Sequence, residues 1–147
     1  GFQVYPLKGN HEDMALTHMI SPNYGMSNYH DELIEPYLSF FHALTYFVEM
    51  DHYYLSHAGF NFVRDDPFED YWGMLWTREV RLAYADTDKH IIRGHVTQPL
   101  NYIKKSVEEK QQLIHLDNGI YKNEPGFGRL CALELTEWQL IVQENIG

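Results

Sequence analysis

The chain has 147 residues, about the length of one domain, and its 44% hydrophobic and 22% charged residues describe a globular chain rather than a disordered one. A net charge of −10 excludes the basic face that nucleic-acid binding requires. It also repels phosphate esters at long range, so an anionic substrate would need a cation between itself and the protein. The sequence has no run of ~18 apolar residues, no signal-peptide pattern and one cysteine, Cys131, which together predict a cytoplasmic protein without a membrane partner.

The first third of the chain predicts a strand followed by two helices. Residues 3–8 form a short extended run, and residues 11–20 read as a helix with acidic residues in its first turn, where they suit the helix dipole. A loop is predicted over residues 21–28. Over residues 31–49, apolar side chains recur at spacings of three and four, which predicts one long helix whose regular part starts at Pro36.

The rest of the chain alternates short strands with turns. Strands are predicted at 51–56, 90–93 and 113–116, a helix at 71–79, turns at 98–101 and 125–128, and a terminal hairpin over 130–135 and 138–142. Several of these strands end in a glycine-containing turn with a polar residue. The pattern predicts an α/β fold, in which ligands bind at the carboxyl ends of the strands.

Three short motifs stand at predicted strand ends: Gly9-Asn10-His11-Glu12, His57-Ala58-Gly59 and Gly94-His95. Each offers an imidazole or an amide oxygen on a tight turn, and glycine lets the backbone approach a metal ion or a phosphate closely. A single histidine is more often structural. The order of the motifs and their shared position at strand ends instead indicate one metal site, and such ligands suit Mn, Fe or Zn.

These motifs resemble the phosphoprotein-phosphatase branch of the calcineurin-like metallophosphoesterase superfamily, and most of all its bacterial serine/threonine phosphatases and symmetrical diadenosine tetraphosphatases. The third motif of that family, Gly-Asn-His-Glu, is complete at 9–12, and its fourth stands at 57–60. The fifth motif, Gly-His-Thr, is present as Gly-His-Val at 94–96. The valine removes a hydroxyl that could support the loop, although a threonine, Thr97, is the next residue.

Two further segments, 75–79 and 114–119, are similar to family segments, so the resemblance covers nearly the whole chain. It implies that residues 1–147 are the carboxyl-terminal part of one metallophosphoesterase domain, without the amino-terminal part. The implied fold is half of a four-layer α/β/β/α sandwich with a carboxyl-terminal β-hairpin.

The resemblance also implies roles for individual residues. Asn10, His57 and His95 would be ligands of one metal ion. His11 would protonate the leaving oxygen or orient the phosphate, and Arg78 would contact the substrate phosphate through its planar fork of donors.

Arg78 has a second interpretation from the sequence. It is followed by an acidic residue, Glu79, and an exposed arginine commonly forms a weak surface ion pair with such a neighbour or with another nearby acid. Both interpretations stand at this point.

The first two family motifs, Asp-x-His and Gly-Asp-x-x-Asp-Arg-Gly, are absent from the chain. In the family they supply the ligands of the first metal and the bridging carboxylate. The intact enzyme would therefore hold two divalent ions (Mn, Fe, Zn or Ni), whereas these 147 residues would bind at most one, weakly, and would be inactive without the missing amino-terminal half as a partner.

The implied function is hydrolysis of a phosphomonoester, with phosphoserine or phosphothreonine in a protein as the favoured substrate and a small phosphate ester as another, through metal-bound hydroxide. One alternative is a diadenosine tetraphosphatase, which cuts a phosphoanhydride with the same motifs. A second alternative is a non-catalytic binding module derived from a degenerate phosphatase.

Overall fold

A computed structural model of the chain describes residues 1–20 and 31–146, and its fold is mixed α/β. The helices are α1 (Asn10–Ile20), α2 (Asp31–Ile34), α3 (Leu38–Ala43), α4 (Tyr71–Trp76) and α5 (Leu100–Glu108), with the 3-10 turns η1 (Glu35–Tyr37) and η2 (Leu82–Tyr84). The strands are β1 (Phe47–Met50), β2 (Tyr53–Ser56), β3 (His90–Arg93), β4 (Leu113–His115), β5 (Arg129–Glu134) and β6 (Gln139–Glu144).

The strands form two sheets. In the larger sheet the order is β1-β2-β3-β4, with β1 antiparallel to β2 and with β2, β3 and β4 mutually parallel. Strands β5 and β6 form a separate antiparallel hairpin, as the alternation over 130–142 predicts. Because β2, β3 and β4 run in the same direction, the turns that follow them meet at one edge of the sheet.

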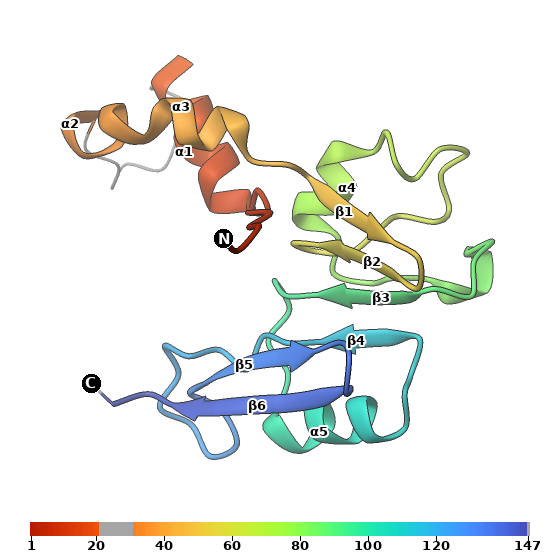
Figure 1. The fold of residues 1–147 in the computed structure, drawn as a ribbon. Coiled ribbons are helices and arrows are strands. Elements are labelled where there is room, and N and C mark those ends of the chain that lie inside the picture. The colour runs from red at the N-terminus through yellow and green to blue at the C-terminus, as the bar shows by residue number, and fades with distance from the viewer. Residues whose placement is uncertain (21–30, 147) are drawn as a thin grey trace.

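The two faces of the larger sheet pack against different apolar clusters, because neighbouring residues of a strand point to opposite sides. Ile91 belongs to one apolar cluster and Ile92 to another. The first cluster contains Tyr54, Phe60, Phe62, Met74 and Ile91. The second contains Ile92, Val107 and Ile114, with side chains of the hairpin such as Trp138 and Leu140 packed against it. The segment with α4 therefore covers one face, and α5 with the hairpin covers the other (Figure 1).

The single helix predicted over 31–49 is wrong in its second half. The chain forms α2, η1 and α3, and helix ends at Ala43, after which β1 begins at Phe47. The spacing of the apolar residues over 44–48 suits either structure. Backbone pairing decides between them, because the N–H of Lys8 donates to the carbonyl of Thr45 at 2.7 Å and holds this segment extended. Helices α1 to α3 gather beyond one end of the sheet (Figure 1).

Two other predicted elements differ from the structure or lie outside it, and one helix was not predicted. The extended run at 3–8 contributes one isolated bridge, between Leu7 and Thr45, rather than a strand. Helix α5 was not predicted, although Pro99 precedes it and Ile103, Ser106 and Val107 bury one side of it. The loop predicted at 21–28 lies outside the described residues.

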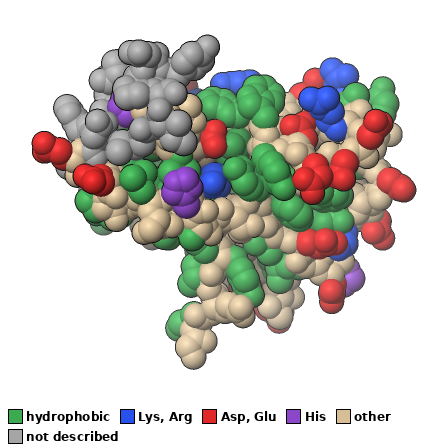
Figure 2. All heavy atoms as spheres, turned by 90° about the horizontal axis from the view of Figure 1, so that it is seen from above, with side chains coloured by type: hydrophobic (Ala, Val, Ile, Leu, Met, Phe, Trp, Pro, Cys, Tyr) green, Lys and Arg blue, Asp and Glu red, His purple; other side chains and the backbone are tan. Residues whose placement is uncertain are grey.

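The surface carries the negative charge that the composition indicates. Figure 2 shows acidic side chains gathered at the end of the molecule away from the residues drawn in grey. Exposed acids of the segment between β2 and β3 include Asp65, Asp66 and Glu69. Within the described ranges, no helix combines the length and the apolar character that crossing a bilayer demands.

Candidate metal centre and phosphate pocket

The turns after the parallel strands bring two histidines together. His57 directly follows β2, and Gly94-His95 directly follows β3. The N–H of Gly94 donates to the carbonyl of His57 at 2.9 Å, so the two turns are joined through their backbones. The convergence of the fourth and fifth motifs therefore follows from the register of the sheet.

Asn10 completes a group of three donor atoms. Its Oδ1 lies 2.8 Å from Nε2 of His57, and the same Nε2 lies 3.1 Å from Nδ1 of His95. An amide oxygen is only an acceptor, and a neutral imidazole carries one proton. One proton on His57 Nε2 cannot fully satisfy both neighbours, so lone pairs face one another in this group. That arrangement fits a cation better than it fits a hydrogen-bond network.

The spacing of the three atoms also suits a metal ion. Two ligand atoms about 2.1 Å from one ion lie roughly 3.0–3.4 Å apart at octahedral to tetrahedral angles. The observed separations of 2.8 and 3.1 Å are close to that range. The other ring nitrogen of His95, Nε2, is buried without a hydrogen-bond partner in the described part of the chain. No cluster of three His, Cys, Asp or Glu side chains suited to a metal occurs among the described residues, so the fit depends on the asparagine.

The electrostatics of the site keep both imidazoles available as ligands. Burial, followed by the proximity of His95, lowers the pKa of His57 to about 4. Burial, together with the positive charges of Arg78 and Arg93, lowers the pKa of His95. Both rings are therefore neutral at pH 7, the state in which imidazole binds a metal.

The turn that presents Asn10 needs a glycine before it. A Cβ at Gly9 would lie 3.2 Å from the ring of His57 and 2.6 Å from a carboxylate oxygen of Glu12. That carboxylate accepts a hydrogen bond from the Gly9 N–H at 2.8 Å, which fixes the first turn of α1. The Gly-Asn-His-Glu motif thus works as a unit that sets Asn10 against His57.

His95 has a left-handed backbone, with φ of 62°. Residues other than glycine rarely adopt this conformation, and strained residues of this kind cluster at functional sites. The strain aims Nδ1 toward His57 and fits a ligand role for His95.

A pocket of about 520 Å³ opens beside the three donor atoms. Its lining consists of Asn10, His11, Glu12, His57, Trp76, Arg78, His95, Thr97, Asp117 and Tyr121. All five residues predicted for the site are in this set, and His11 and Arg78 are both exposed. A larger hollow of about 660 Å³ lies between α5 and β6, and none of the described residues that line it is a histidine.

The surface ion pair considered for Arg78 involves a different arginine. Glu79 pairs with Arg81, with 3.4 Å between the guanidinium nitrogen and the carboxylate oxygen. Arg78 is near His95, since its charge contributes to the lowered pKa of that ring. Its position in the pocket lining is compatible with binding an anion there.

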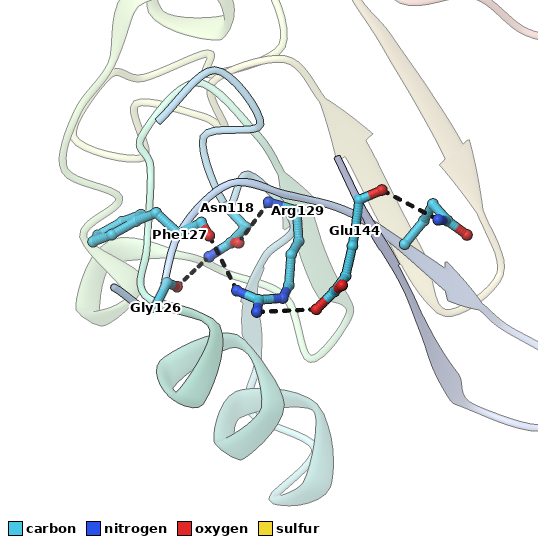
Figure 3. A network of polar contacts seen from close by, with 6 residues as sticks. Asn118, Gly126, Phe127, Arg129 and Glu144 are labelled. Atoms are coloured by element: carbon cyan, nitrogen blue, oxygen red, sulfur yellow. Dashed lines mark hydrogen bonds and ion pairs between the residues drawn. The ribbon is translucent and has the colours of Figure 1, made fainter. Parts of the chain in front are cut away.

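The segment after β4 forms part of the pocket rim, and buried Asn118 holds it in place. The side-chain NH₂ of Asn118 donates to the carbonyl of Gln98. It also donates to the carbonyl of Gly126, and the side-chain oxygen of Asn118 accepts from the N–H of Arg129 (Figure 3). Lys122 donates to the hydroxyl of Thr97 at 3.0 Å, so the residue after Val96 supplies a hydroxyl that supports this rim.

Asp117, Trp76 and Tyr121 also line the pocket, although they are not among the predicted site residues. Asp117 is the second residue after β4, as His95 is the second residue after β3, so its place at a strand end was a signal for it. The sequence favours a core position for Trp76, with stacking in a substrate groove as the alternative; in the structure it is half-buried and its ring lies edge-on to His95, with 6.2 Å between centroids. Tyr121 is 74% exposed on the rim, and no pattern in the sequence indicates its place.

In comparisons with known proteins, no family model, no curated protein and no solved structure matches the chain. The geometry of the site therefore carries the functional argument.

Proposed function

We propose that this chain is the carboxyl-terminal part of a metal-dependent phosphatase of the calcineurin-like metallophosphoesterase type. The observation that supports this most strongly is the convergence of Asn10 Oδ1, His57 Nε2 and His95 Nδ1 beside a pocket that contains His11 and Arg78. In the proposed fold, the mixed sheet and the hairpin form half of a four-layer sandwich.

Asn10, His57 and His95 would hold one divalent cation. One oxygen and two nitrogens form a donor set compatible with Mn, Fe, Zn or Ni. A cation bound there supplies an activated water and neutralises charge on the phosphoryl group. Because the chain lacks the other two motifs, we expect these residues to bind one ion weakly and efficient catalysis to require segments that carry Asp-x-His and Gly-Asp-x-x-Asp-Arg-Gly.

His11 and Arg78 would act on the substrate. The guanidinium of Arg78 offers two parallel donors to the phosphate oxygens. In the hydrolysis, the oxygen of water bonds to phosphorus and the bond from phosphorus to the ester oxygen breaks. His11 donates a proton to that leaving oxygen, and the products are an alcohol and inorganic phosphate.

A phosphoserine or phosphothreonine side chain on a protein is the substrate that we favour. The pocket is open at the side of exposed His11 and Arg78, so a phosphate on an extended chain can reach it. A dinucleoside tetraphosphate uses the same chemistry and is the comparison substrate in the test below.

The first prediction concerns metal binding by the chain itself. Titration with Mn²⁺, followed by electron paramagnetic resonance, should give one weak site, and N10A, H57A or H95A should each weaken it at least about tenfold because each removes a ligand. H42A is the matched control, because His42 is exposed on α3 and outside the pocket. Equal affinity in all five proteins would contradict the proposed site.

Activity is measured on the longer protein in which the two missing motifs precede this chain. It should release phosphate from a phosphoserine peptide, and R78A or H11N should lower kcat/KM by about 100-fold, a typical value for loss of one acid or one charge clamp. Cleavage of diadenosine tetraphosphate without cleavage of the peptide would instead identify a phosphoanhydride as the substrate. Inactivity on both substrates would contradict the phosphatase.

A further inference from the structure

Arg93 is a buried cation that has no part in the site as described so far. It is the last residue of β3, directly before Gly94-His95, and it is only 3% exposed. In the parallel register it lies between Ser56 of β2 and His115 of β4. Its guanidinium therefore lies beneath the edge of the sheet where the site turns begin.

The guanidinium donates to three backbone carbonyls from two separate segments. Nη1 donates to Ala58 at 2.5 Å and to Thr77 at 3.2 Å, and Nη2 donates to Arg78 at 2.8 Å. Nε donates to Nδ1 of His115 at 3.4 Å. These contacts connect Ala58, the residue after His57, with Arg78, the residue predicted to bind phosphate. In the sequence, Ala58 is 35 residues and Arg78 is 15 residues from Arg93.

The local packing is built around this side chain. Gly59 has φ of 101°, and a Cβ there would lie 2.6 Å from Val80 and 3.2 Å from Cδ of Arg93. Among the described residues, the polar partners of Arg93 are three carbonyls and an imidazole, and none is a carboxylate. Burying a cation without a counter-charge is costly, so its hydrogen bonds must compensate. A lysine offers a single point of charge in place of the planar fork and cannot span the same carbonyls.

We infer that Arg93 is a positioning residue that sets the distance between the cation ligand His57 and the phosphate-binding Arg78. This inference rests on the proposed function. Arg93 acts through the backbone of Arg78 and does not itself touch the substrate. Loss of its fork should therefore weaken phosphate binding and leave cation binding almost intact, because Asn10, His57 and His95 keep their other contacts.

The test is a double-mutant cycle on phosphate affinity in the 147-residue chain. Inorganic phosphate is titrated with one equivalent of Zn²⁺ present, and binding is measured by isothermal titration calorimetry, which needs no reporter at position 78. R93K and R78A should each weaken phosphate binding about tenfold, and the double variant should be no weaker than R78A alone, because the two residues act as one unit. Zn²⁺ affinity of R93K should stay within about twofold of the unsubstituted chain.

The matched control is R64K, because Arg64 is exposed and pairs with Asp70 away from the pocket. Circular dichroism shows which variants fold, and R93Q, which keeps an amide donor, replaces R93K if the lysine variant does not fold. If both fail, the Arg93 side-chain N–H groups of the unsubstituted chain should exchange more slowly when phosphate is bound, because binding fixes the Arg78 backbone that they contact, and unchanged exchange overturns the inference.

The outcomes separate the two proposals. Phosphate binding that R78A weakens and R93K does not, or losses that add in the double variant, would overturn the positioning role and leave the proposed function standing. Absence of phosphate and Zn²⁺ binding by the unsubstituted chain would overturn both.

Discussion

His115 is buried at the end of β4, and its environment determines its protonation. Burial, with the charge of Arg93 as a second cause, lowers the pKa of its imidazole to about 4. In the unfolded chain the same group titrates near its ordinary value of about 6.5. Between these two values the unfolded state binds a proton that the folded state does not bind.

This difference predicts a loss of stability in acid. As pH falls from 6.5 to 4, the free energy of unfolding should decrease, and the contribution of one such histidine reaches up to about 1.4 kcal/mol per pH unit. H115N should flatten this slope without abolishing it, because His57 is lowered in the same way. Urea unfolding at pH 7, 6, 5 and 4 measures the slope of the free energy of unfolding against pH. An unchanged slope in H115N would contradict the argument.

The residues of the site differ in how well the sequence indicates them. Asn10, His57 and His95 each sit in a short motif with its own glycine, so local sequence was enough to propose them. Arg93 and Asp117 depend on which strands are neighbours, because their contacts come from distant segments. A sequence without known strand pairing contains little information on such partners.

At the scale of elements, the hairpin and α5 form one packed unit. The indole N–H of Trp138 donates to the carbonyl of Val107 at 2.7 Å, and its ring stacks on Tyr53, with 6.0 Å between centroids. One side chain thus connects the hairpin, the last turns of α5 and β2.

We expect W138A to lower the free energy of unfolding by about 2–4 kcal/mol, since it removes a large packed ring and a hydrogen bond together. W72A is the matched control, because Trp72 is 69% exposed and should change stability by less than about 0.5 kcal/mol. Chemical denaturation of the two variants gives the comparison. Equal effects would mean that the hairpin is not anchored through this ring.

Predicted elements succeeded where the local pattern had one solution. Strand β3 matches the predicted 90–93, and the hairpin strands shift by one or two residues. The predictions were wrong at 44–49, where the spacing of the apolar residues suits a helix or a strand. They also missed α5, a short helix that follows a proline and has a small apolar side. In both places, pairing or packing with distant segments decided the structure.

At the scale of the whole molecule, the net charge of −10 and the acidic surface attract cations. We therefore predict that Mn²⁺ affinity falls about threefold to tenfold when NaCl rises from about 0.05 to about 0.5 M, because salt screens long-range attraction. D65N/D66N, outside the pocket, should reduce the affinity at low salt by less than about twofold. Affinity that is independent of salt would show that local ligands alone set it.

The mixed sheet also explains why motifs far apart in sequence meet. Parallel β2, β3 and β4 place three turns on one edge, and this arrangement was expected from the strand-end pattern of the motifs. The sequence did not predict which elements cover each face of the sheet, since this depends on how α4, α5 and the hairpin pack.

The chain leaves the site after Ala58 and returns to it at Thr77, and both points are bound by the same guanidinium. The segment between them, which includes α4 and the acidic turn at 65–70, is therefore held at both ends by the Arg93 side chain. A loop with fixed ends can change its length or its charge at the tip without moving its base. In the proposed phosphatase, substitutions in this region should therefore leave the positions of the site residues unchanged.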